Sequence, residues 1–388
     1  MSSGTRLTVA SLFCGIGGLD LGFTKAGYDV VWASDISQNA VNTYRKNLGI
    51  QPICKDLKEV EAEAIPKTDV IIGGPPCQAF SLVGKRRQND PRGELVFRFL
   101  DVVGWKRPEA FVMENVPGMA ASYIEGTRLP ELLATRFTEF GYYVKVVKLS
   151  AVDFLVPQKR QRLFILGSLK SEIREPNPWE FSEECYGENK EEFDLSARAA
   201  IGDLGSCVGR GDLASYRSDP ASDFAQMMRS NNGDYVSLHE CPKMSEKDIE
   251  LVNHIPPGGN YTDIPDEIAT PRVMKFKRTG GRTTTYGRLH PDRPAYTINT
   301  YFRRPNVGCN FHYEEKRLIT PREAMRFQSI PDYFEIVYSS QDERNAFIGN
   351  AVPPLLAQAI AWSVMKSFTG KQRLKASQQP LPFSSVDR

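Results

Sequence analysis

The 388-residue sequence contains only four histidines and seven cysteines, and neither set is clustered. No two cysteines have C-x-x-C spacing, and no H-E-x-x-H or related pattern occurs. The sequence therefore predicts neither a structural zinc site nor a disulfide framework. We expect no metal in catalysis, because the chain offers no grouped ligands for one.

Long hydrophobic runs are also missing. No apolar stretch approaches the roughly 18 residues needed to span a bilayer, and the N-terminus lacks the apolar segment of a signal peptide. These absences predict a cytoplasmic protein that does not associate with a membrane. The formal net charge of +2 indicates no partner, because the distribution of charge matters more than its sum.

The chain is long enough for two domains. Strand and helix patterns alternate over residues 1–170, which predicts an α/β fold with a doubly wound, mostly parallel sheet. The alternation is lost after Ser168, so we expect residues 171–312 to form a second, smaller domain. Residues 313–345 would bridge to an apolar helix at 346–368 that returns to the first sheet, and 369–388 would form a polar tail.

A glycine turn, Cys14-Gly15-Ile16-Gly17-Gly18, connects the first predicted strand to a helical pattern. Such a turn presents main-chain amides and a helix N-terminus to a ligand, although it can also serve only for close packing. Asp35 ends the second predicted strand, where a carboxylate can accept hydrogen bonds from ribose hydroxyls. The spacing is not G-x-G-x-x-G, so the pattern favours an adenosine-containing ligand over a dinucleotide.

A buried strand at 69–74 runs directly into Pro75-Pro76-Cys77. The prolines stiffen the backbone before the cysteine, and the carboxyl end of a strand is where open α/β sheets bind ligands. Cys77 is therefore a candidate nucleophile, with a buried, inert cysteine as the alternative. A long polar loop at 79–93 follows; its basic residues suit a polyanion, although an ordinary solvated loop would look the same.

Three further charged residues are candidates for the same site. Glu114 follows the fifth predicted strand and would emerge at the same sheet edge as Cys77. Arg160 and Arg162 alternate at the start of a later strand, so both side chains would point to one face.

The charge pattern changes within the second predicted domain. Acidic residues dominate 172–194, and we expect this stretch to face away from nucleic acid. Between 272 and 304, nine basic residues stand against Asp292 alone, with aromatic residues interleaved. This composition favours a surface that follows phosphates over a merely solvated face.

Taken in order, these motifs resemble those of the bacterial DNA (cytosine-5) methyltransferases over nearly the whole chain. The resemblance implies an enzyme that flips a cytosine out of duplex DNA and transfers the methyl group of S-adenosyl-L-methionine to C5 at a short specific sequence, protecting host DNA in a restriction-modification system. Six motifs carry the resemblance: Ser11-Leu12-Phe13-Cys14-Gly15-Ile16-Gly17-Gly18, Gly74-Pro75-Pro76-Cys77-Gln78-Ala79-Phe80-Ser81, Glu114-Asn115-Val116, Gln158-x-Arg160-x-Arg162, Arg293-Pro294-Ala295-Tyr296-Thr297-Ile298 and Gly349-Asn350-Ala351-Val352-Pro353.

The resemblance also implies residue roles. Cys77 would add to cytosine C6, and Glu114 would hold N3 and N4 and supply a proton at N3. Arg162 would contact cytosine O2 and Arg160 a phosphate or the thiolate, with these two roles open to exchange. No side chain stands out as the base that removes the C5 proton. The cofactor would be bound by Phe13, Gly15, Gly17, Gly18, Leu19, Asp35, Ile36, Asp56, Leu57, Pro75, Leu95, Asn350, Ala351 and Val352.

Double-stranded DNA is the expected partner, bound by a monomer, and the reading allows for a cognate restriction endonuclease acting on the same site. One departure is Asp35, where the family often has glutamate. DNA contacts are expected from Ser81, Lys85, Arg86, Arg87, Arg278, Arg282, Arg288, Arg303 and Arg304.

Two alternatives remain open. A tRNA (cytosine-5) methyltransferase would share the sheet and Cys77, although the insertion at 169–310 favours the reading of duplex DNA. A non-catalytic DNA-binding regulator would transfer no methyl group. An NAD-dependent dehydrogenase is disfavoured by the glycine spacing.

Overall fold

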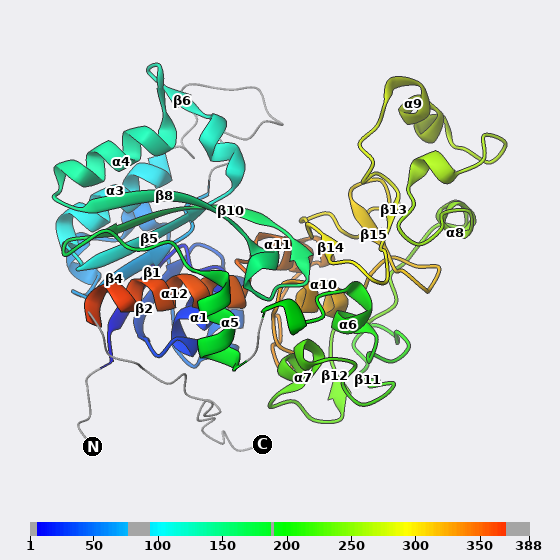
Figure 1. Ribbon diagram of the computed structural model, residues 1–388, viewed down its shortest axis with the longest axis horizontal. Helices are drawn as coiled ribbons and strands as arrows, with labels where there is room; N and C mark the ends of the chain where they lie inside the picture. The colour runs from blue at the N-terminus through cyan, green and yellow to red at the C-terminus, as the bar shows by residue number, and fades with distance from the viewer. Residues whose placement is uncertain (1–5, 77–93, 188–189, 370–388) are drawn as a thin grey trace.

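The chain folds into two lobes, seen side by side in Figure 1. The structure is a computed structural model that describes residues 6–76, 94–187 and 190–369. The first lobe contains a seven-stranded sheet with the order β3-β2-β1-β4-β5-β10-β8. Its strands are β1 (Thr8–Leu12), β2 (Asp29–Asp35), β3 (Ile53–Cys54), β4 (Val70–Gly73), β5 (Ala110–Asn115), β8 (Tyr143–Ser150) and β10 (Gln161–Ser168).

Neighbouring strands are parallel from β3 to β5, and β10 runs antiparallel to both β5 and β8. The predicted doubly wound, mostly parallel sheet is confirmed. This direction matters for the site. Because β10 is antiparallel, its first residues lie at the same edge of the sheet as the last residues of the parallel strands.

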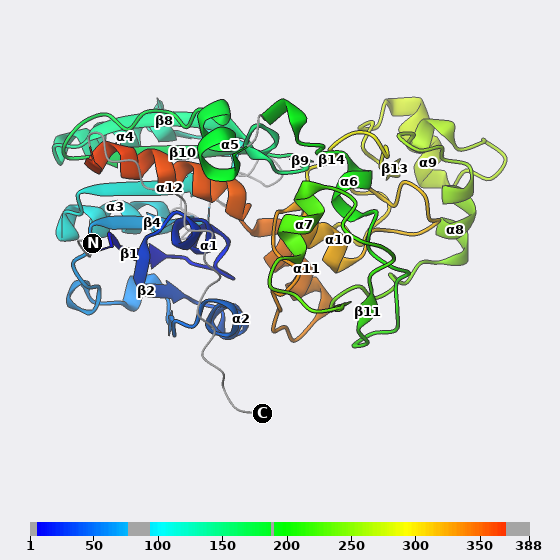
Figure 2. The same cartoon turned by 60° about the horizontal axis from the view of Figure 1, so that its bottom comes forward.

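Helices cover both faces of this sheet (Figure 2). Helices α1 (Gly18–Lys25) and α12 (Pro354–Thr369) lie on one face, and α3 (Glu94–Lys106) and α4 (Leu129–Glu139) lie on the other. Helix α2 (Gln38–Leu48) packs beside β2. Central strands are therefore buried on both sides, which explains why β4 reads as an uninterrupted apolar run.

Helix α12 lies against the first lobe, but the helix expected at 346–368 is divided: α11 (Gln341–Asn350) ends before α12 begins at Pro354. The stretch Gln341–Phe368 is apolar enough to pass a test for membrane spans, but 83% of its apolar window is buried inside the protein. Helix α12 packs mainly on α1. A Cβ atom added to Gly22 of α1 would lie 2.6 Å from the main-chain nitrogen of Gln358 on α12. Glycine at this position lets the two helices approach closely.

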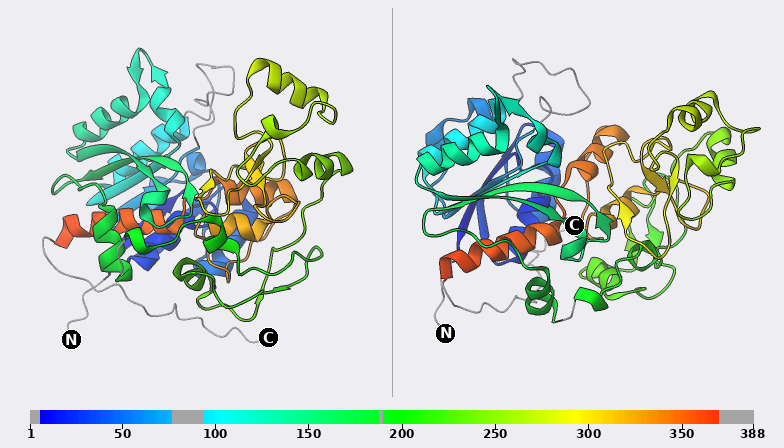
Figure 3. Two further views of the ribbon diagram at one scale, coloured as in Figure 1. Left: turned by 45° about the vertical axis from the view of Figure 1, so that its right-hand side comes forward. Right: turned by 45° about the horizontal axis from the view of Figure 1, so that its top comes forward.

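The second lobe is built from short helices and two-stranded ribbons (Figure 3). Part of it continues the apolar core beneath α12, and part forms a separate small core around Val252 and Phe311. Its elements are α6 (Ala197–Ile201), α7 (Asp223–Arg229), α8 (Glu246–Asn253), α9 (Pro271–Thr279), α10 (Pro321–Phe327), β11 (Ala214–Ser215), β12 (Tyr235–Val236), β13 (Gly287–Arg288) and β15 (Cys309–Phe311).

The boundary between the lobes differs from the sequence prediction at two elements, α5 and β14. Helix α5 (Pro178–Tyr186) was expected in the second domain, but it packs on the first lobe, where the Tyr186 hydroxyl donates a 2.7 Å hydrogen bond to Gln358. Strand β14 (Ala295–Tyr296) pairs with β9 (Gln158–Lys159), so the two lobes share a short ribbon. The start of the second lobe therefore falls after α5.

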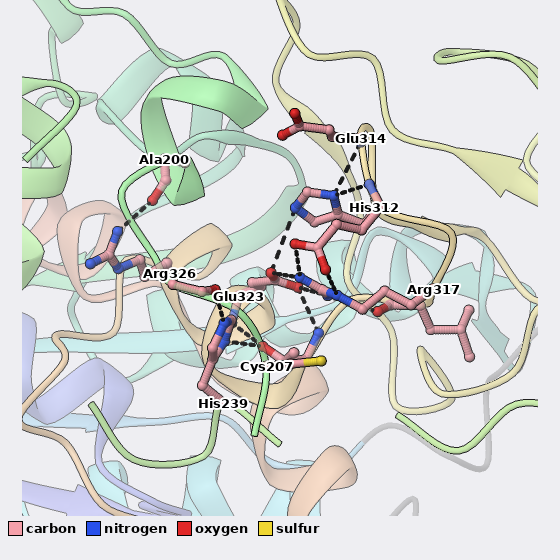
Figure 4. A network of polar contacts seen from close by, with 12 residues as sticks. Ala200, Cys207, His239, His312, Glu314, Arg317, Glu323 and Arg326 are labelled. Carbon is pink, nitrogen blue, oxygen red and sulfur yellow. Dashed lines mark hydrogen bonds and ion pairs between the residues drawn. The ribbon is translucent and has the colours of Figure 1, made fainter. Parts of the chain in front are cut away.

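A buried polar network surrounds the start of α10 (Figure 4). Thr320 and Glu323 form a capping box, which the spacing Thr-x-x-Glu at a helix start predicts, with hydrogen bonds of 3.1 and 2.7 Å. Glu323 also accepts hydrogen bonds from Arg317, and His239 contacts the Thr320 hydroxyl at 2.9 Å. These contacts hold the start of α10 against His239, which lies about 80 residues earlier in the chain, and against Arg317, which directly precedes the helix.

One cysteine pair corrects the sequence reading. Cys207 and Cys241 form a disulfide in the second lobe, although their 34-residue separation gave no local spacing signal. The adjacent residues Val208 and Glu240 form a β-bridge, so tertiary structure brings the two cysteines together. The other cysteines in the described ranges, Cys14, Cys54, Cys185 and Cys309, are free thiols.

Candidate active site

A cavity of about 590 Å³ opens at the carboxyl ends of β1, β2, β4 and β5. Strands β1 and β4 are neighbours, but the chain leaves them in opposite directions, which makes this the topological switch point of the sheet. The volume is in the range of small-molecule sites. Every predicted cofactor residue except Gly17 lines it: Phe13, Gly15, Gly18, Leu19, Asp35, Ile36, Asp56, Leu57, Pro75, Leu95, Asn350, Ala351 and Val352.

The glycine turn serves both the cavity and the packing. Gly15 has φ +54°, and a Cβ there would meet nothing within 4 Å, so its open side faces free space. Gly17 has φ +89°, and a Cβ there would lie 2.9 Å from the Tyr44 ring on α2. Gly17 thus lets the turn pack on α2 and does not line the cavity.

Asp35 ties the end of β2 to this turn. Its two carboxylate oxygens each accept a 2.9 Å main-chain hydrogen bond, one from Gly15 and one from Ser37. A carboxylate oxygen can accept a second hydrogen bond, so Asp35 keeps capacity for a ligand. Burial raises its pKa, and these hydrogen bonds oppose that effect. The neighbouring Ile36 is 68% exposed and offers an apolar surface at the rim.

Glu114 and Arg162 form a buried pair at the other end of the cavity. Glu114 lies at the end of β5, and antiparallel pairing of Leu163 with Asn115 brings Arg162 beside it. Arg162 Nε is 2.8 Å from Glu114 Oε1, and both residues are only 8% exposed. Burial raises the pKa of Glu114, and the Arg162 guanidinium lowers it in turn.

Asn115 holds the proline pair that precedes the predicted nucleophile. Its side-chain Nδ2 donates a 3.1 Å hydrogen bond to the Pro75 carbonyl, and its Oδ1 accepts one from the Val116 main chain. Pro75 and Pro76 both line the cavity. Cys77 follows at once in the sequence but lies outside the described residues. The signal for Asn115 was its place next to Glu114 at the end of an apolar strand.

Arg160 does not join the pair as expected. It is 1% exposed, and its guanidinium donates to the carbonyls of Ile298, Gly349 and Ala351 at 2.8, 2.6 and 3.2 Å. The expected contact with phosphate or thiolate is therefore corrected: among the described residues, this arginine binds main-chain carbonyls of the second lobe and of the segment before α12.

The predicted DNA-contacting arginines fall into two groups. Arg288 is buried, and three of its nitrogens donate to the carbonyls of His312, Ile255 and Glu314, so it is corrected to a structural residue. The exposed members are Arg278 and Arg282 near the end of α9, Arg303 paired with Asp342, and Arg304 over the Tyr301 ring. Ser81, Lys85, Arg86 and Arg87 lie outside the described ranges.

The sequence reading missed two polar residues in the cavity wall. Ser11 on β1 and Asp20 on α1 are both 0% exposed and line the cavity. An acid between Leu19 and Leu21, in the apolar first part of α1, was the available signal for Asp20. Among the described side chains, no group of three His, Cys, Asp or Glu residues is arranged to hold a metal ion.

Comparison with known proteins shows the family of the chain. A family model described as C-5 cytosine-specific DNA methylase matches residues 7–366. The chain belongs to this family. The methylase is 34% identical over 374 residues to type II methyltransferase M.NgoFVII of Neisseria gonorrhoeae, covering 95% of this chain and 89% of the relative. It is 31% identical over 378 residues to M.FnuDI of Fusobacterium nucleatum, covering 95% and 97%.

Solved structures agree with the fold of the methylase. A putative DNA modification methyltransferase encoded within an Escherichia coli prophage aligns with a TM-score of 0.71 and 25% identity, covering 94% of this chain and 99% of that one. Schizosaccharomyces pombe Dnmt2 methyltransferase aligns with a TM-score of 0.55 and 17% identity, covering 93% and 98%. The methylase is accordingly a DNA (cytosine-5) methyltransferase with the α/β fold of its class.

Proposed function

We propose that this methylase uses S-adenosyl-L-methionine and the Cys77 thiol to methylate C5 of a cytosine that is flipped out of duplex DNA. The observation that supports this is a single cavity that joins the glycine turn to the Glu114–Arg162 pair. The Pro75-Pro76 segment, which delivers Cys77, lines the same cavity.

The residues present fit S-adenosyl-L-methionine. Asp35 has spare acceptor capacity for ribose hydroxyls, and Ile36 offers an apolar face for adenine. Asp56 and Leu57 line the same end, suited to the adenine edge. The open side of Gly15 leaves room for the rest of the molecule. When bound, this molecule supplies the methyl group.

Covalent attack explains the need for a cysteine. Cytosine C5 is a weak nucleophile, and addition of the Cys77 thiolate to C6 turns the ring into an enamine. In the proposed reaction Glu114 gives a proton to N3 as the C6–S bond forms. After the methyl group bonds to C5, a base takes the C5 proton, the C6–S bond breaks with its electron pair returning to sulfur, and N3 returns its proton.

The buried pair suits this role for Glu114. Desolvation raises the pKa of its carboxyl group, which favours a protonated acid able to serve N3. Arg162 opposes this shift and fixes the orientation of the carboxyl group. We assign Arg162 to cytosine O2 as well, because it lines the cavity next to Glu114.

The target atom is unreachable inside a duplex, so the base must leave the stack at a cost of a few kcal/mol. We propose that exposed arginines of the second lobe contact phosphates and help to offset this cost: Arg278, Arg282 and Arg304. Three such contacts give a slope of about −2.7 in a plot of log binding constant against log salt concentration.

The decisive experiment uses duplex DNA in which 5-fluorocytosine replaces cytosine. With S-adenosyl-L-methionine present, the wild-type protein should form a complex that survives denaturation, because fluorine cannot leave as a cation. Cys77→Ser should form none while binding the duplex within a few-fold of wild type. A Cys77→Ser variant that still methylates DNA would remove Cys77 from the reaction.

The biological context is also a proposal. The type II names of the relatives support a modification enzyme that protects host DNA alongside a cognate restriction endonuclease. We propose in addition that it acts in the cytoplasm as a monomer. Bisulfite sequencing of DNA from a methylation-free host that expresses the chain would identify the site. Methyl incorporation into tRNA but not DNA would favour the tRNA alternative, and incorporation into neither would favour a binding protein.

A further inference from the structure

The Cys207–Cys241 disulfide lies where the chain passes from one apolar core of the second lobe to the other. Val208 and Leu238 pack on the larger core, which continues beneath α12. Met244, which follows Cys241 closely in the chain, packs on the small separate core. The bond therefore fastens the segment through which the chain enters the small core.

Main-chain hydrogen bonds hold the two bonded segments together independently of the sulfur atoms. The nitrogen of Val208 donates to the His239 carbonyl at 3.0 Å, and the nitrogen of Cys241 donates to the Val208 carbonyl at 2.9 Å. Glu240, between His239 and Cys241, also forms a buried ion pair with Arg344 on α11. Two thiols released here stay opposite each other, so the bond can re-form within the protein at a high effective concentration.

The bond is open to attack by a small thiol, because Cys241 is exposed and Cys207 is half-buried. Disulfides in the cytoplasm, where we propose that this enzyme acts, are rare, since glutathione and thioredoxin keep thiols reduced. Those that do occur there are mostly redox-sensing or catalytic, and exposed disulfides are the ones that exchange readily. The place of this bond therefore favours a reversible cross-link over a permanent one.

We infer that Cys207–Cys241 is a redox-reversible cross-link that raises the affinity of the second lobe for DNA when it is closed. The effect on binding rests on the proposed phosphate contacts of Arg278 and Arg282, which α9 and the residues after it carry on the small core. With the bond open, the entry segment gains conformational freedom that DNA binding must remove again. Binding then weakens although no contact with DNA is lost.

Opening and closing follow thiol–disulfide exchange. A glutathione thiolate attacks Sγ of Cys241, and the S–S bond breaks with its electron pair leaving on Sγ of Cys207, which takes up a proton. A second glutathione thiolate attacks the glutathione sulfur of this mixed disulfide, and Cys241 leaves as a thiolate that is protonated in turn. Two glutathione molecules thus supply two electrons and become glutathione disulfide, and the reverse sequence closes the bond.

The first measurement identifies the state of the two cysteines in the folded protein. Wild type is equilibrated without denaturant in reduced or in oxidised glutathione, quenched with acid, and then denatured and alkylated for mass spectrometry of its peptides. Cys207 and Cys241 should both be alkylated after reduced glutathione and bonded to each other after oxidised glutathione. A bond that stays closed in reduced glutathione, or thiols that do not pair in oxidised glutathione, would overturn the inference.

The second measurement is the affinity for duplex DNA, followed by fluorescence anisotropy in the same two buffers. Wild type should bind about three- to tenfold more weakly in reduced glutathione, with an unchanged slope against salt concentration because every phosphate contact is kept. The double variant Cys207→Ser/Cys241→Ser should match reduced wild type in both buffers. The control Cys185→Ser, which removes a free thiol on α5, should behave as wild type.

Equal affinity of wild type in the two buffers would overturn the inference while the proposed function stands. A difference between the buffers that persists in the double variant would overturn it as well, because another cysteine would then be responsible. Wild type that binds no duplex in either buffer would overturn both the proposed DNA contacts and the effect of the cross-link on them.

Discussion

Arg160 provides the sharpest test of how the two lobes support the cavity. Its guanidinium donates hydrogen bonds to three carbonyls, and two of these, Gly349 and Ala351, flank Asn350 in the cavity wall. Arg160→Met keeps the length of the side chain and removes all the donors. We expect the free energy of unfolding to fall by about 3–5 kcal/mol, because a hydrogen bond to a charged group contributes about 1.5–3 kcal/mol and the loss strands buried carbonyls.

The measurement is equilibrium unfolding in urea followed by circular dichroism, with calorimetric binding of S-adenosylhomocysteine alongside. Affinity should fall with stability, because Asn350 and Ala351 lose their support. Lys159→Met is the matched control, since Lys159 is the exposed neighbour of Arg160, and its stability should stay within about 0.5 kcal/mol of wild type. Loss of methyl transfer by Arg160→Met with stability and affinity unchanged would refute this reasoning and restore a contact with phosphate or thiolate.

Three further predictions concern the packing and charge of the core. Gly22→Ala should lower the free energy of unfolding in urea by about 2 kcal/mol, because the new methyl group forces α1 away from Gln358. Gly118→Ala, where the added Cβ meets open space, should lower it much less. Equal losses of stability would contradict close packing as the cause. Arg326→Met should cost about 3–5 kcal/mol in the same assay, because Arg326 is the nearest ion-pair partner of two fully buried carboxylates, Asp203 and Asp332, which would keep only the longer contacts with Arg229 and Arg322. A loss below about 1 kcal/mol would contradict this ion-pair role. Burial raises the pKa of Asp20 from 3.8 to about 6, so the folded state binds this proton more tightly than the unfolded state. As the pH rises from about 4 to 7, the free energy of unfolding of the ligand-free wild type should therefore fall by up to about 3 kcal/mol relative to Asp20→Asn. Parallel pH profiles of stability for the two proteins would contradict the buried charge.

The local chemistry of the sequence determined most of the first lobe. Apolar runs with glycine or proline at their ends marked β1, β4 and β5, because strands buried on both faces need no polar alternation. The Thr320 and Glu323 pattern predicted its capping box, since the atoms that make it lie within four residues. The motifs also located the cavity wall, because parallel strands end at one edge.

Tertiary structure alone decided the features that join distant segments. Because β10 is antiparallel to β5, Arg162 lies beside Glu114. Arg160, two residues earlier, instead donates to the carbonyl of Ile298, more than 130 residues away in the chain. Arg288 looked like a basic surface residue in the sequence and is buried in the structure. A charged side chain has the same formula in water and in a core, so only the surrounding chain determines whether it meets phosphate, carboxylate or carbonyl oxygen.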